Sequence, residues 1–242
     1  VGGDWSSDVC SSDLSVPAFI AADTGMDVLT HATEAYTSNF ANDYTDGIAL
    51  QTIKLVFQYL EKSVLTGDPE AREKIHNAST MAGMAFANAF LGMSHSMAHK
   101  IGGRFHTVHG RTNAILLPYV IRYNGTRPSK TTTWPKYNYW KADEKFQDIA
   151  RMLGLPHSTP EEAVAAYAKA VYELGEKVGI KMNFKDQGID EQEWKKYTHE
   201  LALLAYEDQC SPANPRLPMV ADMEEIMNDA YYGYKERPGR IK

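Results

Sequence analysis

"DYTDGIALQTIKLVFQYLEKSV", residues 43–64, carries the clearest periodic pattern in the chain. Its large apolar residues recur at spacings of three, four and five positions: Ile48, Ile53, Val56, Phe57 and Leu60. This spacing gathers them on one broad face of an α-helix. The stretch therefore predicts an amphipathic helix that buries one side.

Helix signals continue on both sides of this stretch. Asp68 followed by Pro69 is a typical helix start, because Asp caps the free amides and Pro fits the first turn. The helix it opens runs to Gly92, and its small residues predict a buried central helix: Ala82, Gly83, Ala85, Ala87 and Ala89. Thr159, Pro160 and Glu162 form a capping box that opens another helix.

Further helices are expected at about 142–153, 190–207 and 220–232, and no segment shows the alternation typical of strands. Residues 124–141 are rich in turn formers and lack a period, so they predict a long loop that packs or contacts a partner. The fold class is therefore mainly α, a helical array. Residues 1–14, "VGGDWSSDVCSSDL", have no period and resemble a translated sequencing adaptor. We expect them to be a non-native leader before a domain at 15–242, with the natural chain continuing upstream.

Composition narrows the class of protein. The chain has 242 residues, of which 43% are hydrophobic and 23% charged, as in globular proteins. A formal charge of −6 does not indicate the basic surface that binding nucleic acid or an anionic membrane requires. No apolar run approaches the roughly 20 residues that cross a bilayer, and no signal peptide is evident. Two cysteines, Cys10 and Cys210, predict reduced thiols and a cytoplasmic protein.

"GMSHSMAHKIGGRFHTVHG", residues 92–110, holds four of the eight histidines. His95 and His99 are one helical turn apart and share a face. The pair Gly102 and Gly103 can end that helix and let the chain turn back. His109 would then reach the same pocket as His95.

A second pair in "MDVLTHATEAY" has the same spacing: Asp27 and His31 lie four positions apart on a predicted helix. With His95 and His109 they offer one carboxylate and three imidazoles, a set that suits Fe²⁺ or Zn²⁺ better than Mg²⁺ or Ca²⁺. A fifth position would remain open to a substrate oxygen.

A structural role competes with this hypothesis at every histidine, and spacing by itself does not decide between the two. The structural role is the stronger alternative for His106, and stronger still for His76, His157 and His199, which lie in polar helical or loop contexts.

Together, "GMDVLTHATEAY" and residues 92–110 resemble the double metal signature of the iron-containing (group III) alcohol dehydrogenases. The resemblance covers Ser15 to about Gly233. "FANAFLGMSHSMAHKIGGRFH", "WPKYNYW" and "YEDQCSPANPRLP" resemble the alcohol dehydrogenase half of bifunctional acetaldehyde-CoA/alcohol dehydrogenases.

The resemblance implies a role for individual residues of this chain. It implies metal ligands at Asp27, His31, His95 and His109, the set that the spacing indicates. It places His99 near the metal and the nicotinamide, as a catalytic residue that relays a proton or positions the substrate. It gives Glu34 a role behind the ligands or in helix packing. The "NPR" at 214–216 is assigned to loop structure.

The resemblance also implies NADH-dependent, reversible reduction of acetaldehyde to ethanol, with Fe²⁺ (or Zn²⁺) as Lewis acid and NAD as cofactor. The family's dinucleotide-binding α/β domain carries a glycine-rich phosphate loop, and no such motif precedes the metal motifs here. We therefore expect the helical metal-binding C-terminal domain of the fold, inactive by itself, with no cofactor-binding residue assigned. The expected partners are a small alcohol or aldehyde and further copies of the full-length protein, in a homo-oligomer or filament.

Two alternatives remain open. The chain could be a metal-bound structural or assembly module without catalysis, which NADH binding would help to distinguish. A metal-dependent hydrolase is the more distant alternative, since His and Asp clusters also activate water. Neither motif places a further carboxylate as an obvious general base.

Overall fold

The structure is a computed structural model that describes residues 16–128 and 140–233. Within these ranges all regular structure is helical, which confirms the mainly α fold class. The elements are α2 (Ala18–Thr37), α3 (Asp43–Leu65), α4 (Pro69–Ala89), α5 (Met93–Phe105), α6 (His109–Gly125), α7 (Ala142–Leu153), α8 (Pro160–Lys177), α9 (Glu191–Tyr206), the short 3₁₀ helix η1 (Ser211–Ala213) and α10 (Val220–Tyr232).

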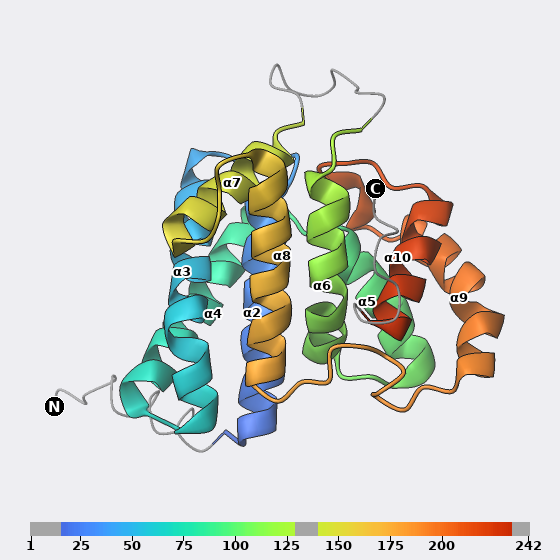
Figure 1. Cartoon of the computed structure of the whole chain (residues 1–242), viewed down its shortest axis with the longest axis horizontal. Helices are drawn as coiled ribbons and strands as arrows, with labels where there is room; N and C mark the ends of the chain where they lie inside the picture. Colours follow the sequence, from blue (N-terminus) through green and yellow to red (C-terminus); the bar gives the residue numbers. More distant parts are fainter. Residues whose placement is uncertain (1–15, 129–139, 234–242) are drawn as a thin grey trace, which may run out of the picture.

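Helices α2, α6 and α8 form the middle of the molecule (Figure 1). α2 packs on α6, and α8 packs on α6 and α7. α3 and α4 cover α2 on one side, while α5 and α10 pack on α6 on the other, with α9 outside them. The metal motifs of the sequence thus fall on α2, α5 and α6, where the two sides meet.

Side-chain caps confirm the predicted helix starts. Asp68 Oδ1 accepts from the Ala71 amide at 2.9 Å at the start of α4. At α8, Thr159 Oγ1 accepts from the Glu162 amide at 3.2 Å. The Glu162 carboxylate accepts from the amide of Ser158 at 2.7 Å, one residue before the Thr159 amide that a capping box would use. The helices expected at 142–153 and 220–232 have these bounds, and the one expected at 190–207 is α9.

Two expectations from the sequence are wrong. Gly102 and Gly103 do not end α5, which continues to Phe105 and stops at His106 in the left-handed conformation, at φ 56°. A glycine inside a helix destabilises it by only about 1 kcal/mol, which is too little to end a helix that other packing contacts stabilise. The predicted central helix α4 lies at the outside, because it buries one alanine face and leaves Met84 exposed.

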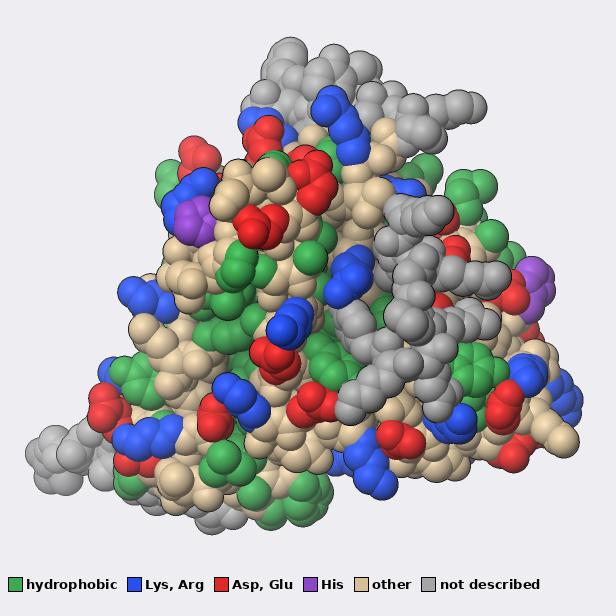
Figure 2. All heavy atoms as spheres, in the orientation of Figure 1, with side chains coloured by type: hydrophobic (Ala, Val, Ile, Leu, Met, Phe, Trp, Pro, Cys, Tyr) green, Lys and Arg blue, Asp and Glu red, His purple; other side chains and the backbone are tan. Residues whose placement is uncertain are grey.

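The expected leader at 1–14 lies outside the described residues, as does most of the loop expected at 124–141. Of that loop, 124–125 close α6, and 126–128 and 140–141 have no helical structure. Within the described ranges, no helix combines the length and apolarity that crossing a membrane requires. On the face shown in Figure 2, acidic and basic side chains are interspersed and form no large patch of one sign.

Candidate metal centre

α2 supplies the first two polar groups of the site. Asp27 and His31 lie one turn apart, and Asp27 Oδ2 is 3.9 Å from His31 Nε2. Both side chains are largely shielded from solvent. The ring of His31 stacks on the ring of His95, with centroids 4.6 Å apart. The predicted i, i+4 pair therefore faces the second motif.

The second motif reaches α2 because the start of α6 packs tightly against it. His95 lies in the first turn of α5, and His109 is the first residue of α6. A Cβ at Gly110 would lie only 2.2 Å from the carbonyl oxygen of Asp23, so only glycine fits this contact. Beside it, Arg111 makes two 2.9 Å hydrogen bonds to the carboxylate of Asp23. This approach brings His109 next to α2.

The four predicted ligands converge on one point. Oδ1 of Asp27 lies 3.7 Å from Nε2 of His95 and 3.7 Å from Nε2 of His109. The ligand atoms of Asp27, His31, His95 and His109 all lie within 4.8 Å of one another. Two ligand atoms about 2.1 Å from one tetrahedral ion lie about 3.4 Å apart, so these separations are close to those of a metal site. They are too long for hydrogen bonds.

One buried polar atom of the cluster has no hydrogen-bond partner within the described structure. His95 is 1% exposed, and its Nε2 makes no hydrogen bond within the described structure. A buried polar atom without a partner is costly and therefore uncommon. A bound cation at the convergence point would satisfy this nitrogen, so the residues present fit a metal.

Glu34 fixes the orientation of His95. Its buried carboxylate accepts a 2.6 Å hydrogen bond from His95 Nδ1, and bonds of 3.0 and 2.7 Å from the amides of Gly92 and Ser94. The Nδ1 hydrogen is thereby committed, and the lone pair of Nε2 is left free. The sequence offered two roles for Glu34, and these contacts fit a carboxylate that orients His95 better than one that only packs helices.

Asn113 is a further contributor that the sequence did not indicate. Its Nδ2 donates to Asp27 Oδ1 at 2.9 Å and lies 3.1 Å from His109 Nε2. Ser94 Oγ in turn donates to Asn113 Oδ1 at 3.2 Å. The only local signal was its position four residues after His109, on the same face of α6.

The protonation of the imidazoles suits ligation. Burial, together with the neighbouring His95, lowers the pKa of His31 to about 4, although Asp27 and Glu34 oppose the shift. Burial also lowers the pKa of His109. Neutral imidazole is the form that binds a metal. Both rings are therefore in the neutral form at neutral pH.

The other histidines do not belong to the four-residue cluster, although His99 lies beside it. His99 stacks on His109, with ring centroids 5.5 Å apart, and its Nδ1 lies 3.1 Å from Asp208. His106 is exposed and ends α5. His157 Nδ1 lies 2.7 Å from the Leu155 carbonyl oxygen, and His199 Nδ1 lies 2.8 Å from Glu224.

The loop "NPR" does more than turn the chain. Asn214 is buried, and its Oδ1 accepts from the amide of Met93 at the start of α5 and from Asn124 of α6. Its Nδ2 donates to Asn124 Oδ1 and to the carbonyl oxygen of Arg216. These bonds hold the segment that carries His95, a role that the sequence did not indicate.

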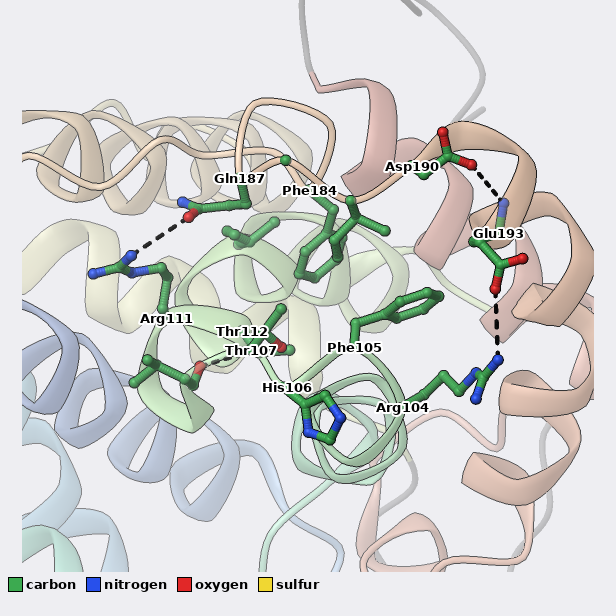
Figure 3. A pocket seen from close by; sticks show the side chains of 14 residues that line it. Arg104, Phe105, His106, Thr107, Arg111, Thr112, Phe184, Gln187, Asp190 and Glu193 are labelled. Atoms are coloured by element: carbon green, nitrogen blue, oxygen red, sulfur yellow. Dashed lines mark hydrogen bonds and ion pairs between the residues drawn. The ribbon is translucent and has the colours of Figure 1, made fainter.

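A separate hollow of about 520 Å³ lies beside the turn between α5 and α6 (Figure 3). None of the four clustered residues lines it. Its two arginines already have acceptors: Arg104 pairs with Glu193 at 3.5 Å, and Arg111 contacts Gln187 as well as Asp23. Neither arginine of this hollow is therefore free to bind an anion.

A helical domain with an Asp/His cluster on three helices, anchored by the buried His95, defines a class of metal-binding protein. Comparisons with known proteins identify the family. The sequence model of the Fe-containing alcohol dehydrogenase family, C-terminal, matches residues 21–231. The chain belongs to this family. The fold class predicted from the sequence is thereby confirmed as the helical C-terminal domain.

Two relatives and one solved structure illustrate the similarity. The chain is 79% identical over 229 residues to an aldehyde-alcohol dehydrogenase of Streptococcus pneumoniae serotype 2, with 95% of this chain covered and 26% of the relative. It is 42% identical over 227 residues to an NADPH-dependent butanol dehydrogenase of Clostridium saccharobutylicum, covering 93% of this chain and 55% of the relative. A crystal structure of 1,3-propanediol oxidoreductase matches with a TM-score of 0.79 and 35% identity, over 90% of this chain and 53% of that one. The chain thus spans about a quarter to about half of the proteins it matches.

Proposed function

We propose that this chain provides the metal site of an iron-dependent alcohol dehydrogenase that reversibly reduces acetaldehyde to ethanol with NADH. The observation that carries the proposal is the convergence of Asp27, His31, His95 and His109 around the unpartnered Nε2 of buried His95. Similarity to an aldehyde-alcohol dehydrogenase favours the interconversion of an aldehyde and an alcohol, and the resemblance to bifunctional acetaldehyde-CoA/alcohol dehydrogenases favours acetaldehyde and ethanol. Zn²⁺ is the second candidate ion, because the donor set accepts both.

The residues of the site have different proposed roles. When bound, the metal supplies Lewis acidity at the carbonyl oxygen and the nicotinamide supplies the hydride. Asp27 and the three ligand histidines hold the ion, with Glu34 and Asn113 orienting His95 and Asp27. His99 is the proposed catalytic residue, which gives a proton to the substrate oxygen in reduction and takes it back in oxidation.

The chain spans about a quarter to about half of the relatives it matches, and we propose that by itself it binds NADH weakly and does not turn over. In the complete enzyme it would act on a small alcohol or aldehyde, in a cytoplasmic homo-oligomer or filament. The alternative of a metal-bound assembly module predicts the same metal binding but no effect of His99 on turnover in a relative of full length.

Metal content tests the proposal. The purified chain is titrated under anaerobic conditions with Fe²⁺ and, separately, with Zn²⁺, beside His95→Ala. We expect one ion per chain for the wild type and none for the variant. His106→Asn is the matched control, because it changes an exposed histidine of the same segment to a residue that tolerates the left-handed conformation. Unchanged metal content in His95→Ala would refute the assignment.

A further inference from the structure

His99 and Asp208 form a contact that the metal cluster does not include. Asp208 follows the end of α9, and its side chain is 6% exposed. Its Oδ2 lies 3.1 Å from Nδ1 of His99, on α5. The ring of His99 lies nearly parallel to that of His109, at 16°. Asp208 therefore contacts the one histidine that stands beside the ligands without being among them.

The Asp208 carboxylate is surrounded by donors. The Lys100 ammonium lies 2.8 Å from Oδ2, and the Cys210 amide donates to Oδ1 at 3.0 Å. Burial raises the pKa of the Asp208 carboxyl, but the bonds from Lys100, Cys210 and His99 outweigh it and hold this pKa at about 2. The group is thus an anion at neutral pH, and an ionised carboxylate can only accept hydrogen bonds.

An acceptor at this position decides which ring nitrogen of His99 carries the hydrogen. In the neutral imidazole one nitrogen donates and the other accepts. Since Nδ1 faces the carboxylate, Nδ1 must carry the hydrogen. Nε2 is then the basic atom, and it makes no hydrogen bond within the described structure.

We propose that Asp208 is a positioning residue that holds His99 in its Nδ1–H tautomer, so that Nε2 is the atom that exchanges a proton with the substrate hydroxyl. This inference rests on the proposed function and extends it to a second carboxylate–histidine pair. In alcohol oxidation the hydroxyl proton moves to Nε2, while Nδ1–H stays bonded to Asp208. In aldehyde reduction the same proton returns from Nε2 to the substrate oxygen.

A second metal site is the competing explanation for this cluster, because His99, Asp208 and Cys210 also place three ligand atoms close together. Two observations argue against it. The ammonium of Lys100 already occupies the side of Asp208 that a cation would need. Burial raises the pKa of the Cys210 thiol to about 12, so a metal would also have to displace a firmly held proton there.

The tautomer of His99 is directly measurable. Nitrogen NMR of the chain labelled with ¹⁵N-histidine distinguishes Nδ1–H from Nε2–H, and the His99 signals are assigned by their absence in His99→Gln. We expect Nδ1–H in the wild type. We expect the Nδ1–H form to lose its dominance in Asp208→Ala, which removes the accepting carboxylate altogether. The wild-type measurement needs no variant to fold, and Nε2–H in the wild type would overturn the proposal.

Glu224→Ala is the matched control, because Glu224 lies 2.8 Å from Nδ1 of the exposed His199. This variant removes the same kind of contact elsewhere and should leave His99 as Nδ1–H. If His99 stays wholly in the Nδ1–H tautomer in Asp208→Ala, Asp208 does not position it and the proposal fails.

Titration with Zn²⁺ alone separates this inference from the proposed function. Asp208 is not among the four ligands, so Asp208→Asn should still bind one Zn²⁺ with an affinity within about threefold of the wild type. Loss of that zinc would make Asp208 part of the metal site and overturn the positioning role. Failure of the wild type to bind zinc would count against the proposed function, while the tautomer measurement would still decide the role of Asp208.

Discussion

Glu34→Gln tests how far the metal site depends on the carboxylate behind it. Glu34 is 2% exposed and accepts three hydrogen bonds, two at Oε2 from His95 Nδ1 and the Gly92 amide and one at Oε1 from the Ser94 amide. Glutamine has the same shape but only one accepting oxygen. The least costly arrangement keeps that oxygen at the Oε2 position. The new amide group then faces the N–H of Ser94, donor to donor.

The magnitude follows from these contacts. One buried donor left unsatisfied costs about 1–3 kcal/mol, and the loss of charge weakens the two remaining bonds. The free energy of unfolding of the metal-free chain should fall by about that amount. The hold on the His95 ring loosens as well, and loss of such a partner typically reduces metal affinity by about 10–100-fold.

Two assays measure the two effects. Urea unfolding of the metal-free chain gives the change in stability, and competition with a chromophoric chelator gives the dissociation constant for Zn²⁺. Glu162→Gln is the matched control, because Glu162 also accepts from a backbone amide but lies exposed at the start of α8. The control should change zinc affinity by less than twofold. An equally small change in Glu34→Gln would refute the idea that Glu34 orients a ligand.

Two further predictions concern stability. Gly110→Ala should lower the free energy of unfolding by about 1–3 kcal/mol and weaken metal binding, because the new methyl collides with the Asp23 carbonyl and pushes α6 away from α2. Thermal unfolding measures the effect, with Gly103→Ala as the control, because a Cβ at Gly103 would meet nothing within 4 Å. Asp208→Asn should cost about 2 kcal/mol at pH 7, because the folded state holds this pKa at about 2, below its ordinary 3.8. A depressed carboxyl pKa stabilises the fold at pH values above the ordinary pKa, and this stabilisation is lost as pH falls towards 2. The difference in unfolding free energy between wild type and Asp208→Asn, measured by urea unfolding, should therefore be smaller at pH 2.5 than at pH 7. A difference independent of pH would contradict the assignment.

Local patterns in the sequence predicted the parts of the molecule that are local in space. Asp27 and His31 are one turn apart on a helix, so their spacing alone places them together. The start of α4 follows from Asp68 and Pro69 for the same reason. The end of α5 was wrong, because Gly102 and Gly103 suggest a stop while packing carries the helix on to Phe105.

Contacts between distant segments could not be predicted in this way. Asn113 bonds to Asp27, 86 positions away, and His99 meets Asp208, 109 positions away. No periodicity links such residues, because their proximity depends on how α2, α5, α6 and the end of α9 pack. Spacing suggested Asp27, His31, His95 and His109 as one ligand set and the resemblance to a family assigned it, but neither gave the helix packing that brings them together.

The distribution of the four clustered residues also bears on folding. Asp27 and His109 lie on different helices, with α3, α4 and α5 between them in the chain. An ion held by both would close that long loop and act as a removable cross-link, which the unfolded chain cannot form with the same geometry. A ligand that binds only the native state stabilises it in proportion to the logarithm of its free concentration. The supply of metal would then govern how much of the chain stays folded and escapes proteolysis, independently of any reaction at the site.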